Sequence, residues 1–258
     1  MPAVAKMVNR PFAEKLQEAQ YFIAHNIALY KTPAVAWSGG KDSTLVLWLC
    51  LKLKPDILTV FNNTGVEYPE TVRFIHKLRD KWEVNLIETT PLKRFWDIVA
   101  VKGFMNKTKN SNGSHGGVCC ADLKEYPMER AQRQYHIDAL FTGVTAPESR
   151  QRQFTALRLG ACYTYKKTGV RKVHPILWWT EVEVRQYHAD MDIPLNPMYE
   201  KGCDRIGCMP CTAYKTWESQ LSLTNPKLYR LLKLRKDKQY CMDMGSPETP
   251  PPSKAVKP

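Results

Sequence analysis

Short apolar runs alternate with longer stretches of helical periodicity from residue 34 onward, and this alternation constrains the fold more than any other feature. Strands are expected at four short apolar runs: 34–37, 57–61, 84–87 and 137–141. Helices are expected at four longer amphipathic stretches between and after them: 43–53, 70–82, 92–101 and 121–135. Strand and helix in alternation are typical of βαβ units. The sequence therefore predicts an α/β fold, with helices flanking a twisted parallel sheet.

Other segments flank this alternation. Apolar residues recur at helical spacing over 11–30, which predicts an N-terminal helix within residues 1–30. Residues 31–215 are expected to form the main domain, which ends in a cysteine-bearing helical segment. Composition predicts three further segments: a mobile loop over 103–117 that closes over a substrate, a basic helix over 216–244 and a disordered tail over 245–258.

The charge of the chain indicates the kind of partner it attracts. Thirty-eight lysines and arginines stand against 25 acidic residues, which leaves a formal net charge of +13. A positive potential of this size attracts nucleotides, nucleic acids or an acidic protein. No run of about 18 apolar residues is present, and the first residues lack the apolar stretch of a signal peptide. We therefore expect a cytoplasmic protein without membrane contact, whose oligomeric state the sequence does not indicate.

A glycine-rich loop follows the first expected strand and opens the first expected helix of the sheet. It reads Ser38-Gly39-Gly40-Lys41-Asp42-Ser43. The amides at a helix N-terminus donate hydrogen bonds to anions, and glycines let the backbone approach a phosphate closely. Lys41 adds a positive charge, the serines add hydroxyls, and Asp42 could orient a metal ion. The loop is therefore a candidate phosphate site, although it lacks the spacing of a Walker A motif.

The loop resembles the pyrophosphate loop of the adenine nucleotide α-hydrolases, also called N-type ATP pyrophosphatases. The resemblance implies that residues 38–43 bind the β,γ-phosphates of ATP with Mg²⁺, and that Lys41, Asp42 and Ser43 are catalytic. Asn63, Thr64 and Gly65 follow the second strand, where they are expected to flank the adenosine. Thr142, Gly143 and Arg150 fall in a segment that is similar to the family's TG-x-R-x-x-E-S-x-x-R pattern, with Thr145 in place of the first arginine.

Four cysteines form two pairs that lie about ninety residues apart in the chain: Cys119, Cys120, Cys208 and Cys211. In a reducing compartment such pairs are candidate metal ligands rather than disulfides. Four thiolates can hold zinc or an iron–sulfur cluster. Adjacent thiolates strain a single tetrahedral zinc, whereas a cubane offers them different iron atoms, so the pattern favours [4Fe-4S].

The segments around these cysteines resemble those of cluster-bearing adenylylsulfate reductases, within the phosphoadenylylsulfate (PAPS) reductase family. The first reads Cys119-Cys120-Ala-Asp-Leu-Lys124-Glu-Tyr-Pro127, and the second reads Arg205-Ile-Gly207-Cys208-Met-Pro-Cys211-Thr. The resemblance covers about residues 33–215 and implies a [4Fe-4S] cluster on the four cysteines beside the nucleotide. Cys203 has no assigned role, and Cys50 and Cys162 are expected to be packed thiols.

Two reactions fit this scaffold. A sulfonucleotide reductase attacks sulfur with a thiolate in a Glu-Cys-Gly-Leu/Ile-His segment, whereas this sequence has only Cys241 in Tyr-Cys-Met-Asp-Met-Gly. Reductases also tend to have a degraded phosphate loop, whereas Lys41, Asp42 and Ser43 are all present. The interpretation favoured is therefore an ATP pyrophosphatase that adenylates an acceptor for sulfur incorporation, as in DNA phosphorothioation or tRNA thiolation. The alternatives are an assimilatory adenylylsulfate or PAPS reductase and a non-catalytic nucleotide- and cluster-binding subunit.

The same interpretation implies particular partners. The basic stretch 150–172, which contains two tyrosines, suits a nucleic-acid backbone and stacked bases, so DNA or tRNA is a candidate acceptor. A cysteine desulfurase is the candidate sulfur donor for a pyrophosphatase. Thioredoxin is the candidate electron donor for a reductase.

Overall fold

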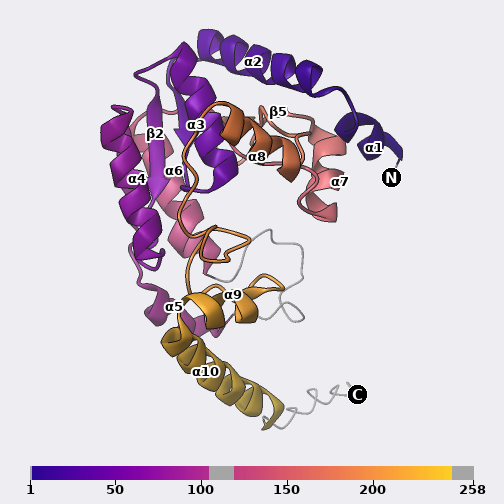
Figure 1. Cartoon of the computed structure of the whole chain (residues 1–258). Coiled ribbons are helices and arrows are strands. Elements are labelled where there is room, and N and C mark those ends of the chain that lie inside the picture. The colour runs from indigo at the N-terminus through magenta and orange to yellow at the C-terminus, as the bar shows by residue number, and fades with distance from the viewer. Residues whose placement is uncertain (1, 105–118, 246–258) are drawn as a thin grey trace, which may run out of the picture.

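The computed structural model describes residues 2–104 and 119–245, whose helices and strands are drawn in Figure 1. The strands are β1 (Pro33–Ala36), β2 (Leu58–Asn62), β3 (Leu86–Thr89), β4 (Ala139–Thr142), β5 (Cys162–Thr164) and β6 (Arg171–Val173). The α-helices are α1 (Pro2–Val8), α2 (Phe12–Leu29), α3 (Lys41–Leu53), α4 (Pro69–Lys81), α5 (Phe95–Lys102), α6 (Tyr126–Gln134), α7 (Arg150–Leu159), α8 (Glu181–Asp190), α9 (Trp217–Thr224) and α10 (Pro226–Gly245), and a π-helical turn, η1, spans Ala121–Glu125.

The strands form one sheet in the order β3-β2-β1-β4-β6-β5. All neighbouring pairs are parallel except β5 with β6, which form an antiparallel edge. The predicted α/β class and the mostly parallel sheet are confirmed. The chain places β2 and β3 on one side of β1 and then returns to place β4 on its other side. Such a switch point opens a crevice at the carboxyl ends of the two central strands, where ligands of open α/β sheets bind.

Alternate residues of the central strands face opposite layers, as the two-residue period of a strand requires. Val35, Phe61 and Phe141 pack into the larger apolar core, which includes residues of α2, α3, α4 and α8. Their neighbours in sequence pack on the other face of the sheet, against Ala131 of α6. Burial on both faces explains why these strands appear in the sequence as continuous apolar runs.

The N-terminal segment forms two helices where the sequence predicted one. Pro11 stands between them, and a proline disfavours helical geometry in the residue before it. The two helices are joined by Lys15, which is buried and donates from Nζ to the carbonyl oxygen of Val8 at 2.8 Å. The same ammonium lies 2.5 Å from Glu183 at the start of α8. The N-terminal helices are thereby attached to the face of the sheet that carries α8.

A second apolar cluster lies at the carboxyl end of the strands. It joins α5 and η1 to α9 and α10, which follow about one hundred residues later. Its buried members are Phe95, Ile98, Phe104, Leu123, Trp217, Leu221 and Leu232. Figure 1 shows α5, α9 and α10 grouped below the sheet, with α10 extending away from it. The predicted C-terminal helix is divided in two because Asn225 and Pro226 end α9 and begin α10.

Some sequence predictions concern residues outside the described part of the chain. Most of the predicted loop 103–117 lies there, as does the predicted tail after Gly245. In the described part, no helix is long and apolar enough to cross a membrane.

Candidate nucleotide site and cysteine site

The glycine-rich loop lies at the switch point, because it connects β1 to α3. Gly39 has a φ of +71°, and a Cβ built there would lie 3.0 Å from the side chain of Ile75. The loop therefore needs glycine at this position for both its conformation and its contact with α4. Gly40 caps α3 in an extended conformation, so the first amides of the helix face the crevice.

Two serine hydroxyls hold the loop closed. The Ser43 hydroxyl donates to the carbonyl oxygen of Gly40 at 3.0 Å and accepts from the amide of Ser38 at 3.2 Å. The hydroxyls of Ser38 and Ser43 lie 3.1 Å apart. The loop is therefore preorganised by its own side chains.

The segment after β4 approaches the loop at backbone distance. A Cβ built on Gly143 would lie 2.5 Å from the carbonyl carbon of Asp42 and 2.5 Å from the amide nitrogen of Ser43. Any side chain there would displace the start of α3. Thr142 precedes it, and its hydroxyl lies 2.6 Å from Nδ1 of His174. Burial, followed by the positive charges of Lys172 and Arg152, lowers the pKa of His174 to about 4, so this histidine is neutral at neutral pH.

Three side chains from residues 188–199 form hydrogen bonds with the backbone of the loop. Asn196 donates from Nδ2 to the carbonyl oxygen of Gly39 at 3.1 Å. Nε2 of His188 lies 2.9 Å from the carbonyl oxygen of Lys41. The hydroxyl of Tyr199 accepts from the amide of Lys41 at 2.9 Å. Sequence reasoning assigned no role to these residues.

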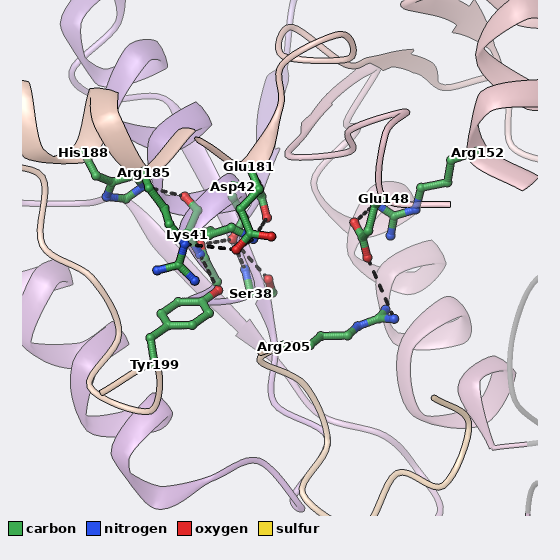
Figure 2. A network of polar contacts seen from close by, with 12 residues as sticks. Ser38, Lys41, Asp42, Glu148, Arg152, Glu181, Arg185, His188, Tyr199 and Arg205 are labelled. Atoms are coloured by element: carbon green, nitrogen blue, oxygen red, sulfur yellow. Dashed lines mark hydrogen bonds and ion pairs between the residues drawn. The ribbon is translucent and has the colours of Figure 1, made fainter. Parts of the chain in front are cut away.

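A charged network lies in front of α3 (Figure 2). Nζ of Lys41 is 3.2 Å from Asp42 and 3.9 Å from Glu181, and Glu181 accepts from Nε of Arg185 at 3.0 Å. The ring centroid of Tyr199 lies 5.8 Å from Nζ of Lys41 and 5.3 Å from the guanidinium of Arg185. The cations that would meet a phosphate are thus held in place by carboxylates and an aromatic ring.

A second group of charges faces this network. Glu148 forms an ion pair with Arg152 of α7 and lies 3.9 Å from Arg205, as Figure 2 shows. Burial lowers the pKa of Arg152, whereas the nearby carboxylates of Glu148 and Asp42 raise it. Arg152 and Arg205 lie across from Lys41 and Asp42 in Figure 2.

Arg150, the arginine chosen from sequence, is exposed at the start of α7. Arg152 stands three residues after Ser149, which is the position of the last arginine in the TG-x-R-x-x-E-S-x-x-R pattern. That spacing was the signal that the sequence assignment overlooked.

The residues after β2 connect the loop region to the cysteines. Asn63 donates to Glu88 at 2.7 Å and accepts from the amide of Gly65 at 3.0 Å. The hydroxyl of Thr64, which is buried, donates to Glu67 and lies 3.5 Å from Sγ of Cys208. This part of the predicted adenosine wall therefore contacts the cysteine segment directly.

The two cysteine pairs are brought together although they lie about ninety residues apart. Cys208 forms a β-bridge with Glu67, and the amide of Met209 donates to the carbonyl oxygen of Val66 at 2.8 Å. Cys119 and Cys120 immediately precede η1. A hydrogen bond with Cys120, burial, and the charges of Cys120, Cys208 and Cys211 raise the pKa of Cys119, so the second pair influences the first.

Lys124 of η1 is the cation of this neighbourhood. Burial by itself would lower its pKa, but negative charge on Cys208 and Glu67 raises it above its usual range. Burial raises the pKa of the Cys208 thiol to about 11 despite the positive charge of Lys124. Burial is also the main cause that raises the pKa of Cys211. The thiols of Cys119, Cys208 and Cys211 therefore resist ionisation until positive charge is added to the site.

In the described ranges, 2–104 and 119–245, no three histidine, cysteine, aspartate or glutamate side chains converge closely enough to hold one metal ion. A four-iron cubane engages each thiolate through a different iron atom, so its ligands stand farther apart than those of a single ion. The four partly buried thiols fit such a group in number and chemistry. Cys50 and Cys203 are buried instead, and burial raises the pKa of both thiols.

A mostly parallel sheet with a preorganised anion loop at its switch point defines a nucleotide-binding α/β protein. The chain belongs to the phosphoadenosine phosphosulfate reductase family, because the family model described as "Phosphoadenosine phosphosulfate reductase domain" matches residues 32–214. This family is enzymatic and handles nucleotides.

Some relatives of the chain are named as uncharacterized proteins, and others are named as reductases. It is 32% identical over 213 residues to "Uncharacterized protein MJ0066" of Methanocaldococcus jannaschii, a match that covers 81% of this chain and 42% of the relative. The chain thus spans about two fifths of the length of the M. jannaschii relatives it matches. It is 28% identical over 182 residues to the phosphoadenosine 5'-phosphosulfate reductase of Xylella fastidiosa strain M12, with 68% of this chain and 70% of the relative covered.

Solved structures support the fold. PAPS reductase from Candida auris superposes with a TM-score of 0.58 at 18% identity, covering 74% of this chain and 88% of that one. FMN adenylyltransferase from Candida glabrata superposes with a TM-score of 0.56 at 13% identity, covering 80% and 68%. At these identities the likeness concerns the fold alone.

Proposed function

We propose that the chain is an ATP pyrophosphatase that activates an oxygen atom of an acceptor for replacement by sulfur. The observation that carries this proposal is the intact phosphate loop, with Lys41 and Asp42 poised at the N-terminus of α3. A reductase acts on a nucleotide without a β,γ-pyrophosphate, so it has no use for a loop that binds one. This chain retains every side chain of such a loop.

The reaction would proceed in two steps. The acceptor oxygen attacks the α-phosphorus of ATP, and the bond from that phosphorus to the bridging β-oxygen breaks, so pyrophosphate leaves with the electron pair. A sulfur nucleophile then displaces AMP, which carries away the acceptor oxygen. Lys41 and the amides of α3 would stabilise the charge of the leaving pyrophosphate. A Mg²⁺ ion bound with ATP would neutralise the same charge, and Asp42 is the carboxylate of the loop available to it.

The opposite wall of the site supports the same proposal. Arg152 and Arg205 face Asp42 across the site and are joined to each other by Glu148. Cations on two sides of a site suit a ligand with several phosphates. Lys124, placed among the cysteine thiols, would add positive charge beside the nucleotide. Cys119, Cys120, Cys208 and Cys211 would hold a [4Fe-4S] cluster there. The acceptor that fits the basic stretch 150–172 is a nucleic acid, with DNA or tRNA as the candidates.

A second candidate function is favoured by the names of relatives. The Xylella fastidiosa relative is named as a phosphoadenosine 5'-phosphosulfate reductase. Such a reaction would need a nucleophilic thiolate, and the 258 residues contain no Glu-Cys-Gly-Leu/Ile-His segment to supply it. We therefore place the reductase second.

One experiment separates the two functions. The protein is purified anaerobically and incubated separately with ATP, adenylylsulfate and phosphoadenylylsulfate, the last two with reduced thioredoxin, and pyrophosphate and sulfite are quantified in each. Pyrophosphate from ATP without sulfite from either sulfonucleotide is the expected result. Sulfite from a sulfonucleotide would replace the proposal with the reductase. If neither product forms, the remaining interpretation is a non-catalytic binding subunit.

A further inference from the structure

The hydroxyl of Tyr199 occupies a position that a bound anion would be expected to take. It accepts the hydrogen bond of the Lys41 amide at 2.9 Å, and Lys41 is the first residue of α3. The same oxygen lies 3.5 Å from a Cβ built on Gly40, so it stands directly over the loop. The first amides of a helix have no partner within the helix, and they are the donors that anions bind.

A phenol that accepts a hydrogen bond still has its own hydrogen to donate. Among the residues that the structure describes, the Tyr199 hydroxyl makes no second hydrogen bond. Burial raises the pKa of this phenol, so it keeps its hydrogen at neutral pH. The hydroxyl therefore receives one hydrogen bond from the helix and has one to give.

The surroundings of the ring indicate which group receives that hydrogen bond. Nζ of Lys41 lies 5.8 Å and the guanidinium of Arg185 lies 5.3 Å from the ring centroid. Both cations are balanced by Asp42 and Glu181 in Figure 2. An anion that binds at both the amide and Nζ of Lys41 would therefore lie within reach of the phenolic hydrogen.

We propose that Tyr199 is a direct ligand of the terminal diphosphate of the nucleotide, donating its hydroxyl hydrogen to a phosphoryl oxygen while accepting from the Lys41 amide. The inference rests on the proposed function, since it assigns the loop a diphosphate. The ligand class is inorganic pyrophosphate or the β,γ-end of a nucleoside triphosphate. In the opposite arrangement, the hydroxyl blocks the Lys41 amide and has to move away before the diphosphate binds. Removal of the hydroxyl would then strengthen pyrophosphate binding instead of weakening it.

The test compares Tyr199→Phe with wild type by calorimetric titration of inorganic pyrophosphate and, separately, of AMP. We expect pyrophosphate binding to weaken about ten- to a hundredfold, as for a lost hydrogen bond to a charged group, and AMP binding to stay unchanged. Tyr21→Phe is the matched control, because Tyr21 is an exposed tyrosine on α2. Pyrophosphate binding that is unchanged or tighter in Tyr199→Phe would overturn the inference, as would wild-type protein that does not bind pyrophosphate.

A second variant covers a loss of folding in Tyr199→Phe. If that variant melts well below wild type, 3-fluorotyrosine is placed at position 199, which keeps the ring and makes the hydroxyl a stronger donor. Tighter pyrophosphate binding is then expected, and unchanged binding would overturn the inference. Binding needs no turnover, so a protein that does not cleave ATP but loses pyrophosphate binding in Tyr199→Phe would refute the proposed function and retain Tyr199 as a ligand.

Discussion

The phosphate loop and the cysteine site lie at the carboxyl ends of neighbouring strands, but they are held together in different ways. In the loop, serine hydroxyls and the side chains of His188, Asn196 and Tyr199 bind the backbone. At the cysteines, burial and mutual repulsion raise the pKa of the thiols, and Lys124 is the cation among them. The loop is thus complete before its ligand arrives, whereas the thiols become stable anions only with added positive charge.

The two regions also differ in packing. Gly143 lies against the backbone of Asp42 and Ser43, whereas a Cβ on Gly207, beside Cys208, would meet no heavy atom within 4 Å. A crowded backbone fixes the geometry of an anion site to fractions of an ångström. The room at Gly207 leaves the cysteine segment space to adjust around a bulky group.

The largest expected effect concerns the cysteine site. Cys211→Ser should remove the iron and the visible absorbance of anaerobically purified protein completely, because the cluster needs all four thiolates. Cys162→Ser, which changes a thiol near Asn26 on α2, should retain both. Stoichiometric zinc in the wild-type protein, with no iron, would contradict the cluster assignment.

The next effect concerns the loop. Lys41→Ala and Asp42→Ala should each lower pyrophosphate release from ATP about a hundredfold or more, because Lys41 would stabilise the leaving pyrophosphate and Asp42 would hold the Mg²⁺ that does the same. Both variants should keep the absorbance of the cluster, since the two regions are held separately. Lys52→Ala, at the exposed end of α3, is the control and should keep wild-type activity. Unchanged release in Lys41→Ala would remove the main support for the proposed function.

Glycine substitutions compare the packing of the two regions directly. Gly143→Ala should reduce the free energy of unfolding by about 3 kcal/mol, since its Cβ would overlap the backbone of α3. Gly207→Ala should change it by less than about 0.5 kcal/mol. Urea denaturation of both variants measures the difference. Equal losses would mean that the cysteine segment is packed as tightly as the loop.

The smallest effect is a pH dependence that belongs to the loop region. His174 has a folded-state pKa of about 4, lowered first by burial, against about 6.5 in the unfolded chain. Folding requires the neutral form of this histidine, so the free energy of unfolding is fully retained above about pH 6.5 and decreases as pH falls toward 4. We expect about 2 kcal/mol less stability at pH 5 than at pH 7 from this group. His174→Asn should show a flatter profile in urea denaturation, and an unchanged profile would assign the acid sensitivity to other groups.

Sequence patterns predicted the features that depend on neighbouring residues. The loop 38–43 and the strands β1 to β4 follow from apolar runs and glycine placement, because both depend on neighbouring residues in the sequence. The sequence analysis chose Arg150 rather than Arg152, although the spacing of Arg152 from Ser149 matches the family pattern. The antiparallel edge strand β5 was missed because a three-residue strand carries too little periodicity to recognise.

The sequence by itself determined the class of fold, the position of an anion loop after the first strand, and the presence of four thiols in two pairs. Only the tertiary structure decided which distant side chains complete these sites. His188, Asn196 and Tyr199 reach the loop from about 150 residues away, and Cys208 reaches Thr64 from a similar distance. Such contacts depend on how the helices and loops pack on the sheet, and no local pattern of residues records that packing.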